Sequence, residues 1–353
     1  MSLIFDKAPK SLCILRLSAI GDVTHVLPVI RTLQNHWPET KLTWIIGKAE
    51  ASLVDDIEGI EFIVFDKSEG RQAYFRLRKT LKGRRFDVLL HMQAALRASI
   101  ASLFIRADIK VGFDKNRSRD FQHWFSKKQI SGDSRVHVID TFFQFLKTLG
   151  IDQQVLQWNI PTSHEDKIFA AETLENKPSL VINPCTSVRG NNWRNWKIER
   201  YAAVIDYAAS TYKLHTVLTG GPAIEEREFG EAIIAKANAP VNNMIGCSSL
   251  KQLQAILGAA EVVIAPDTGP AHMAAATGVP VIGLYASSNP LRTGPYNSLK
   301  WTVNKYPQAL MQYDNQDVQT AKWGQRVRAA DVMNLIKVVD VTMMLDEVMH
   351  RTM

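Results

Sequence analysis

Asp267-Thr268-Gly269-Pro270-Ala271-His272 follows the apolar run Glu261-Val262-Val263-Ile264-Ala265-Pro266 and precedes Met273-Ala274-Ala275-Ala276-Thr277-Gly278. A β-branched apolar run, a glycine turn and an alanine-rich stretch predict a strand followed by a helix, with the helix N-terminus at the carboxyl edge of a sheet. Backbone N–H groups at such an N-terminus bind anions, and Gly269 lets the backbone approach a ligand closely. The segment therefore predicts a phosphate site.

The same hexapeptide has a simpler interpretation, because an Asp-Thr pair before a helix often serves only as an N-cap, which stabilises the helix by about 1 kcal/mol. A second apolar strand, Val279 to Tyr285, ends in the polar turn Ala286-Ser287-Ser288-Asn289-Pro290. This turn would lie beside the first one in a parallel sheet. Two adjacent strand ends rich in Ser, Thr and Gly favour a phosphate or ribose site over capping alone.

Length and composition predict a globular protein of two domains. The chain has 353 residues, of which 46% are hydrophobic and 22% charged, and this length exceeds what one ordinary core accommodates. Cys13, Cys185 and Cys247 are odd in number and lack zinc or disulfide spacing, so we expect free thiols in the cytoplasm. Arg16 interrupts the first apolar run, which does not resemble a signal peptide. The longest uncharged window, residues 268–291, contains three prolines and is typical of a buried core rather than a membrane span.

Strand and helix patterns alternate along both halves of the chain. This alternation predicts an α/β fold of two doubly wound parallel sheets, which we expect to face each other across a cleft. We expect an N-terminal domain at 1–160, a second domain at 161–330, and a helical terminal segment at 331–353 that packs back on the N-terminal domain or on the second. The expected strands are 11–17, 42–46, 60–64, 86–91, 179–182 and 215–219, and the expected helices are 23–35, 49–55, 72–82, 198–211, 225–238 and 327–349.

The first strand runs into the turn Ser18-Ala19-Ile20-Gly21-Asp22. A dinucleotide fingerprint needs three glycines in this turn, and the single Gly21 argues against NAD or FAD. Asp22 instead places a carboxylate at a helix N-terminus, where the helix dipole favours the ionised form, and this suits a general base. A purely structural role for Asp22 as a helix cap is the alternative.

Three separated motifs resemble those of the glycosyltransferase family 9 heptosyltransferases. They are the turn 18–28, Trp193-Arg194-Asn195-Trp196, and 267–272 together with Gly283-Leu284-Tyr285. These motifs extend over nearly the whole chain in order and spacing. The resemblance implies a GT-B fold and an inverting, metal-independent transfer, without a cofactor. It implies ADP-L-glycero-D-manno-heptose as donor and the inner core of lipopolysaccharide, Kdo-lipid A, as acceptor.

The resemblance also assigns roles to individual residues. It implies that Asp22 is the general base and that Glu225 or Glu226 holds the ribose, although paired Glu in a first helical turn often only complements the dipole. His272 is the least specific member of the set, since it is also suited to a packed core. Family members usually carry Lys where this chain has Arg194. The implied donor-binding residues are Thr186, Ser187, Arg194, Glu225, Glu226, Asp267, Thr268, Gly269 and His272.

We expect a metal-free site to neutralise the departing diphosphate with Arg194, the Thr186 and Ser187 hydroxyls and the helix N-terminus after Asp267. The sequence contains no Asp-x-Asp motif that would hold a divalent ion at a diphosphate. One carboxylate on the acceptor side, with no candidate nucleophile opposite it, favours a single inverting displacement. We therefore predict no metal ligands.

Positive charge is concentrated in the first half. Residues 71–135 contain sixteen Lys and Arg against five Asp, a net charge of +11, whereas the whole chain carries +7. Such a surface would bind an acceptor rich in phosphates and carboxylates and the anionic face of the inner membrane. A solvated basic face is the alternative. Nucleic acid is disfavoured, because aromatic residues make up only 8% and no binding motif is present. The candidate acceptor-binding residues of this region are Arg71, Arg76, Arg97 and Arg119, with His91 and Gln93 added from the fourth strand.

The fourth strand departs from the family pattern. It ends in His91-Met92-Gln93 where many relatives have Asp-x-Gln. His91 would contact the acceptor or act as an auxiliary acid or base, or it would be a buried histidine. We favour transfer of the first heptose to Kdo, by an enzyme peripherally bound to the cytoplasmic face of the inner membrane. The alternatives are the second heptose transfer, another GT-B nucleotide-sugar enzyme, and a non-catalytic nucleotide- or lipid-binding module.

Overall fold

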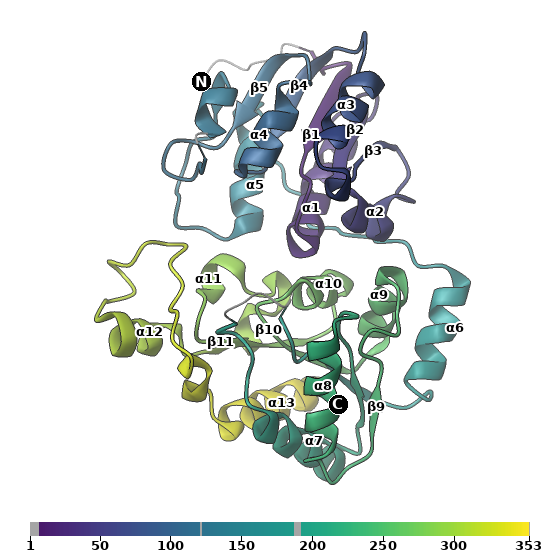
Figure 1. The fold of residues 1–353 in the computed structure, drawn as a ribbon, viewed down its shortest axis with the longest axis vertical. Coiled ribbons are helices and arrows are strands. Elements are labelled where there is room, and N and C mark those ends of the chain that lie inside the picture. Colours follow the sequence, from purple (N-terminus) through teal and green to yellow (C-terminus); the bar gives the residue numbers. More distant parts are fainter. Residues whose placement is uncertain (1–6, 121, 187–191, 353) are drawn as a thin grey trace. The chain divides into compact units, whose positions relative to one another are not determined.

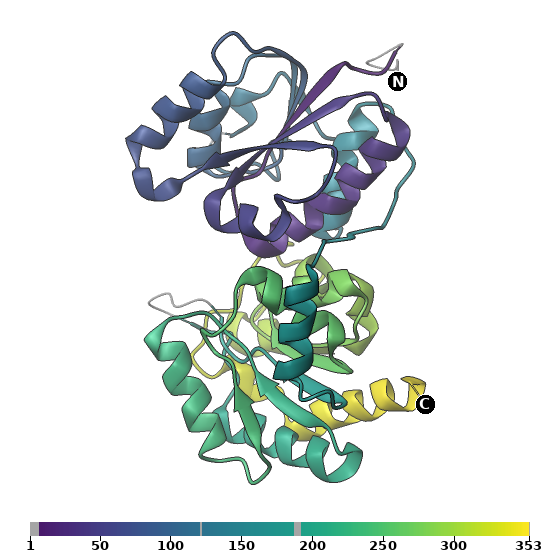
Figure 2. The same ribbon diagram turned by 90° about the vertical axis from the view of Figure 1, so that its right-hand side faces the viewer.

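The computed structural model describes residues 7–120, 122–186 and 192–352. The chain divides into two compact units, Met1–Pro161 and Thr162–Met353. Each unit contains a parallel sheet, of six strands within the described residues, and helices that pack against it (Figure 1). In the first unit α1 and α5 lie on one face of the sheet and α3 and α4 on the other (Figure 2).

The first sheet has the order β3-β2-β1-β4-β5-β6. Leu12 to Leu15 of its central strand are fully buried, which explains the uninterrupted apolar run. Leu15 pairs with Ile45 on one side and with His91 on the other, so three strands end at the same edge. The strands are β1 (Ser11–Leu15), β2 (Lys41–Gly47), β3 (Ile60–Phe65), β4 (Phe86–His91), β5 (Ala107–Gly112) and β6 (Lys128–Gln129).

The longest helix of the first unit, α1, buries Val23, Val26, Leu27, Ile30 and Leu33. This spacing places the apolar side chains on one face toward the sheet and α5. The strand before it ends at Leu15 instead of the expected Leu17, because the chain turns at Arg16. The helices are α1 (Ile20–His36), α2 (Lys48–Val54), α3 (Arg71–Thr80), α4 (Leu96–Ser102) and α5 (Val138–Thr148), with short 3-10 turns at Lys67–Glu69 and Gln122–Phe125.

The second sheet has the order β12-β11-β10-β7-β8-β9. Every residue of β10 and of β11 is buried, as their apolar sequences predict. Because β10 pairs with β7 and β7 with β8, the carboxyl ends of these strands meet at one edge. The strands are β7 (Ser179–Ile182), β8 (His215–Leu218), β9 (Val241–Asn243), β10 (Val262–Pro266), β11 (Val281–Tyr285) and β12 (Val303–Asn304).

Side chains define where several helices of the second unit begin. Ser163 caps α6, Ser249 caps α9, and Thr268 caps α10, which ends at Gly278 with a positive φ of 89°. The helices are α6 (His164–Thr173), α7 (Ile198–Tyr212), α8 (Ile224–Ile234), α9 (Leu250–Ala259), α10 (Gly269–Thr277), α11 (Pro290–Thr293), α12 (Tyr306–Ala309) and α13 (Val338–Thr352). Short 3-10 turns lie at Tyr296–Trp301 and Val332–Leu335, and a π-helical turn lies at Leu310–Asp314.

The terminal segment differs from the sequence prediction in where its helix begins. The expected helix from residue 327 begins only at Val338, and Val332–Leu335 forms a 3-10 turn. Of the two packing alternatives, the structure shows packing within the second unit, because Val341, Leu345 and Val348 are buried in the second unit's core. Across the described ranges, none of the helices is both long and apolar enough to span a membrane.

Candidate active site

Asp22 lies in the first turn of α1, where the chain leaves β1. Its carboxylate is about one-third exposed, with 33% of the side-chain surface accessible. Asp22 Oδ2 forms an ion pair with Arg16 Nη2 and accepts a hydrogen bond from Ala19 N at 3.3 Å. The arrangement holds one oxygen in place and leaves the carboxylate accessible, which is what a general base for an external hydroxyl requires.

Arg16 holds this carboxylate and is itself fixed on several sides. Its side chain is only 10% exposed, and Nη1 donates to Met92 O at 2.5 Å. The guanidinium lies over the Phe142 ring at 5.3 Å, and the Arg16 carbonyl accepts a hydrogen bond from Trp44 Nε1 at 3.2 Å. Sequence reasoning treated Arg16 only as a charge that interrupts an apolar run. The sequence did contain a signal for the role of Arg16, namely its position directly after a buried strand. A guanidinium that is buried there requires an ionic or hydrogen-bonding partner.

Gln93 stabilises the turn between β1 and α1. Its Oε1 accepts a hydrogen bond from Leu17 N at 2.7 Å, and its Nε2 donates to Ser18 Oγ at 3.1 Å. Both polar atoms of the Gln93 amide therefore form hydrogen bonds that position the loop before Asp22. Contact with an acceptor remains a proposal for this side chain, and the structure adds a positioning role.

His91 is fully buried at the end of β4. Burial and the nearby Lys110 lower the pKa of His91 to about 3, so the imidazole is neutral at physiological pH. Because the ring is inaccessible, the expectation that His91 contacts an acceptor or acts as an auxiliary acid is corrected: it is a buried histidine. The carbonyl of His91 accepts a hydrogen bond from Gln122 Nε2 at 3.0 Å.

The first unit contains a cavity of about 320 Å³ at the carboxyl edge of its sheet. The loops after β1, β2 and β3 line it together with Arg97 of α4. Gly47 is required at its wall, because a Cβ there would collide with Leu17 O and with the Glu50 carboxylate. The lining residues are Leu17, Ser18, Gly47, Lys48, Ala49, Glu50, Phe65, Asp66, Lys67, Ser68 and Arg97.

The polar side chains of the cavity are predominantly cationic at its rim. Lys48 forms an ion pair with Asp66 at 3.0 Å, whereas Lys67 and Arg97 are exposed and have no acidic ion-pair partner in the described part of the chain. Glu50 is buried in the wall, and burial raises its pKa, an effect that a backbone hydrogen bond, Lys67 and Arg16 partly offset. A sugar-sized group with a negative charge would fit this surface.

The raised pKa of Glu50 predicts a pH-dependent effect on stability. Below the ordinary value of 4.5 the carboxyl is protonated in both the folded and the unfolded chain, so wild type and Glu50→Gln should unfold alike. Above that value the unfolded chain ionises first, and the free energy of unfolding of the wild type falls until the pH passes the raised folded pKa. Glu50→Gln should therefore be more stable than wild type at pH 7, because the amide carries no charge that burial would penalise.

Chemical denaturation from pH 4 to pH 7 measures this difference. Glu58, which is exposed, supplies the matched control, since Glu58→Gln should show no pH-dependent gain. A Glu50→Gln variant that loses stability relative to wild type as the pH rises would contradict the assigned effect of burial.

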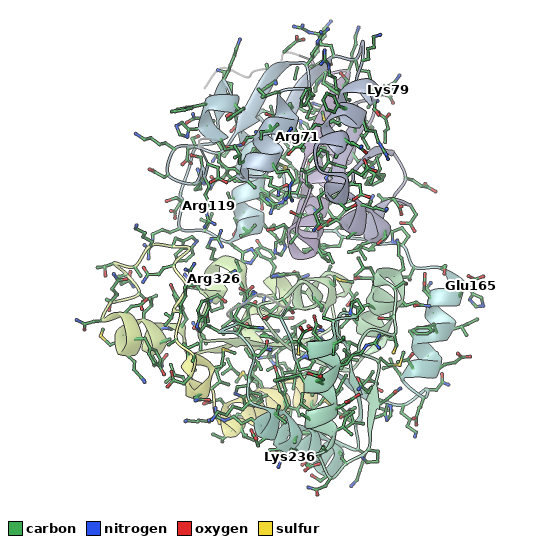
Figure 3. All side chains as sticks on the ribbon, viewed as in Figure 1. Arg71, Lys79, Arg119, Glu165, Lys236 and Arg326 are labelled. Carbon is green, nitrogen blue, oxygen red and sulfur yellow. The ribbon has the colours of Figure 1, made fainter. Side chains whose placement is uncertain are left out.

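The basic residues of the first unit come from several elements. Figure 3 shows Arg119 apart from Arg71 and Lys79, which both belong to α3. Arg71 and Arg119 are exposed, while Arg76 forms an ion pair with Glu69 at 2.8 Å. Glu69 and Glu61, which pairs with Arg84, lie outside residues 71–135 and so offset part of the net charge of +11, while Arg85 and Arg117 pair with Asp108 and Asp114 of the same range. Of the candidate acceptor arginines, Arg97 is the one that lines the cavity.

In the second unit, amide side chains connect Thr186 with residues 192–195. Thr186 is buried, and its N and Oγ1 both donate to Asn195 Oδ1, at 3.0 and 3.3 Å. Asn192 Nδ2 donates to the same oxygen at 2.9 Å, and Asn192 Oδ1 accepts from Arg194 N at 3.0 Å. The predicted donor residue Ser187 lies outside the described residues. The network positions Arg194 beside the end of β10.

Arg194 connects this loop to the DTGPAH motif. Its Nη1 donates to Asp267 O at 2.6 Å and lies 3.6 Å from Asp267 Oδ2. The Asp267 side chain is only 8% exposed, and its Oδ1 lies 3.9 Å from His272 Nε2. A second guanidinium, that of Arg326, lies 3.5 Å from Oδ2. Sequence reasoning missed Arg326, because only the fold brings it next to the motif.

The N-terminus of α10 is capped by Thr268, as the simpler interpretation of the sequence predicts, and a phosphate site there stays a prediction. Thr268 Oγ1 caps the helix by accepting a hydrogen bond from Ala271 N at 3.4 Å, and Gly269 is the first helical residue. The N–H groups of the first turn and the helix dipole attract negative charge at this point. Since β10 and β7 are neighbours in the sheet, Thr186 and Asp267 lie at the same edge.

The two candidate ribose ligands differ in their surroundings. Glu226 is buried, and its Oε2 accepts a hydrogen bond from Gly221 N at 2.7 Å, so this carboxylate stabilises the turn after β8. Glu225 is exposed at the first turn of α8 and is accessible to a ligand. Over the ranges that the structure describes, His, Cys, Asp and Glu side chains form no group of three or more that could hold a metal ion.

Comparisons with known proteins identify the family. Residues 74–321 match Glycosyltransferase family 9 (heptosyltransferase). The chain is 39% identical over 336 residues to the lipopolysaccharide core heptosyltransferase OpsX of Haemophilus influenzae. The aligned region covers 95% of this chain and 96% of that protein. It is 22% identical to lipopolysaccharide heptosyltransferase 1 of Escherichia coli K12, over 86% of this chain and 97% of the relative.

Solved structures agree on the fold. A family 9 glycosyltransferase from Veillonella parvula superposes with a TM-score of 0.78 at 21% identity, covering 97% of each chain. The E. coli ADP-heptose heptosyltransferase II gives a TM-score of 0.73 at 17% identity, covering 97% of this chain and 99% of the other. The expected GT-B fold of two doubly wound α/β units is confirmed. With its family match extending over most of its length, the chain belongs to glycosyltransferase family 9, the heptosyltransferases, and is a glycosyl-transferring enzyme.

Proposed function

We propose that the enzyme transfers heptose from ADP-L-glycero-D-manno-heptose to the Kdo region of the lipopolysaccharide inner core, with inversion and without a metal ion. The observation that carries the proposal is the joint position of Thr186, Arg194 and the capped N-terminus of α10 at one sheet edge. The names of the relatives support it, because OpsX is a lipopolysaccharide core heptosyltransferase and the E. coli relative is a lipopolysaccharide heptosyltransferase.

The second unit is proposed to bind the donor. Arg194 and the first N–H groups of α10 would face the diphosphate, and Glu225 would be available to the ribose hydroxyls. As the anomeric C–O bond breaks, its electron pair goes to the diphosphate oxygen, where negative charge accumulates. Thr186, Thr268, Gly269 and His272 complete the proposed set, with Ser187 outside the described residues. Glu226 supports the turn beside them.

Asp22 is proposed as the general base. Its accessible carboxylate would take the proton of the acceptor hydroxyl while that oxygen bonds to the anomeric carbon. With one base and one direct displacement, the configuration at that carbon inverts. Arg16 forms an ion pair with one carboxylate oxygen and holds it in place, so that the other remains available.

The cavity of the first unit is the proposed subsite for an anionic part of the acceptor. Arg97 and Lys67 lie on its rim, and Kdo carries a carboxylate that such groups bind. Arg71, Arg76 and Arg119 do not line this cavity and are proposed to contact other anionic groups of the acceptor or of the membrane.

Replacing Arg97 tests the acceptor subsite. We expect Arg97→Gln to raise the acceptor KM roughly tenfold, since one charge-assisted hydrogen bond contributes about 1.5–3 kcal/mol. The KM for ADP-heptose should not change. Arg106 is an exposed arginine of the same unit that does not line the cavity, and Arg106→Gln serves as control. An unchanged acceptor KM in Arg97→Gln would exclude the subsite.

Association with the cytoplasmic face of the inner membrane is proposed from the surface of α3. Phe75 is 68% exposed on this helix, and Arg71, Arg78 and Lys79 are exposed around it. An exposed aromatic side chain among basic residues suits the interface of an anionic lipid layer. Nucleic acid is not a proposed partner.

The donor half is tested by calorimetry in EDTA with ADP, UDP and GDP. We expect ADP to bind more tightly than the other two nucleotides, and to do so without metal. Preference for UDP would favour another GT-B nucleotide-sugar enzyme. Failure of every nucleotide to bind would contradict the proposed donor site, and nucleotide binding without any transferase activity would favour the non-catalytic module.

A further inference from the structure

Arg326 brings a second guanidinium to the donor motif from a separate part of the chain. Its Nη2 lies 3.5 Å from Asp267 Oδ2, and Arg194 Nη1 lies 3.6 Å from the same oxygen. The two arginines come from different loops of the second unit, one after β7 and one before α13. Figure 3 labels Arg326. The geometry makes Asp267 the common partner of both.

The backbone around Arg326 is fixed. Val327 is fully buried, its N donates to Ser287 O at 2.9 Å, and its carbonyl accepts from Ser287 Oγ at 2.9 Å. The Gln325 carbonyl accepts a hydrogen bond from Tyr306 OH at 3.0 Å. These contacts attach the segment to the polar turn after β11. The Arg326 side chain nevertheless remains 45% exposed, so a positioned cation faces solvent.

Asp267 is shared between two cationic side chains. One buried carboxylate faces two guanidiniums and lies next to the N-terminus of α10. Asp267 Oδ2 accepts no hydrogen bond within the described part of the chain and contacts both arginines only at ion-pair distance. The Arg326 guanidinium therefore makes no hydrogen bond to the Asp267 carboxylate, whereas Arg194 Nη1 already donates to the Asp267 carbonyl. Two rigid planar donors close together suit an anion with several oxygens, such as a diphosphate.

We propose that Arg326 binds the donor diphosphate together with Arg194 and that Asp267 positions both guanidiniums. This inference rests on the proposed donor site of the second unit. When the anomeric C–O bond breaks and its electron pair moves to the diphosphate, Arg326 stabilises the charge that develops there. The alternative is a structural ion pair, in which Arg326 only holds its own segment against Asp267.

Nucleotide affinity distinguishes these roles. We expect Arg326→Gln to weaken ADP binding roughly tenfold, the effect of losing one charge-assisted contact, and to leave adenosine binding unchanged. Arg326→Lys keeps the charge and should recover part of the ADP affinity. The control is Lys322→Gln, which removes an exposed positive charge from the same segment. Calorimetry measures ADP, and displacement of labelled ADP measures adenosine, all at one ionic strength.

Equal ADP binding by wild type and Arg326→Gln, or equal losses for ADP and adenosine, would overturn the proposal in favour of a structural ion pair. If the wild-type enzyme bound no ADP, the proposed donor site itself would fail, and this result is separate from any effect of Arg326. A tenfold loss confined to ADP, absent in Lys322→Gln, would support the assignment.

Discussion

Replacement of Asp22 by Asn is expected to abolish most heptose transfer while leaving ADP binding intact. The amide has nearly the shape of the carboxylate but cannot accept the proton of the acceptor hydroxyl. General-base catalysis contributes about 10²–10⁴-fold, and kcat should fall by this factor. Arg16 keeps its hydrogen bond to the Met92 carbonyl in the variant, so the turn should retain its structure. Release of ADP in the presence of acceptor measures kcat.

An exposed aspartate of the same unit provides the comparison. Asp152→Asn should leave kcat unchanged, and both variants should unfold near the wild-type temperature. If Asp22→Asn transferred heptose at the wild-type rate, Asp22 would be a helix cap and the base would have to be sought elsewhere.

Removal of Arg194 is expected to slow transfer almost as strongly. Arg194→Ala deletes a cation beside the proposed diphosphate and the hydrogen bond to the Asp267 carbonyl. Loss of one preorganised group that stabilises developing charge costs about 10²–10³-fold in kcat. ADP affinity should also decrease, because the same charge binds the ground-state diphosphate. Steady-state kinetics with varied ADP-heptose separates the two effects.

A lysine substitution tests whether the effect depends on the positive charge of Arg194. Arg194→Lys should recover a large part of kcat, since the resemblance to the family implies Lys at this position. Lys197→Ala removes an exposed charge from the same loop and should leave both parameters unchanged. Full activity in Arg194→Ala would show that Arg194 only connects two loops.

The parallel strands were predictable because they are buried on both sides. In β10 and β11 every residue is apolar or small and every residue is buried, so the sequence pattern reports the environment directly. Leu12 to Leu15 of β1 are likewise apolar and buried, but the point at which β1 ends depends on a side chain distant in the sequence. Gln93 accepts the hydrogen bond from Leu17 N, and no local pattern around residue 17 indicates where the chain leaves the sheet.

Some helices carried signals that the sequence analysis did not use. The capping box of Ser249 and Gln252 marks the start of α9, and α5 has a strongly apolar face with Phe142 and Phe145 buried. The sequence analysis predicted too early a start for the terminal helix. Apolar residues before Val338 are also buried, although they lie outside that helix. Periodicity does not distinguish such a segment from a helix.

The residues that sequence reasoning missed depend on tertiary contacts. Arg326 and Glu50 are unremarkable in their local sequence, and each acquires its role from surroundings that the fold brings near. His91 shows the converse, because a histidine at a strand end suggests chemistry and the structure buries it completely. The motifs predicted which sheet edges carry the candidate site residues, and the fold determines which charged side chains lie next to them.

Transfer to a defined acceptor is the decisive test of the proposed function. Kdo-lipid A is incubated with ADP-heptose and the wild-type enzyme in EDTA, and the acceptor is analysed by mass spectrometry. The proposed function predicts a mass gain of one heptose. A gain only on an acceptor that already carries heptose would move the enzyme to the second transfer, and no gain on either acceptor would contradict the assignment of ADP-heptose and the inner core as its substrates.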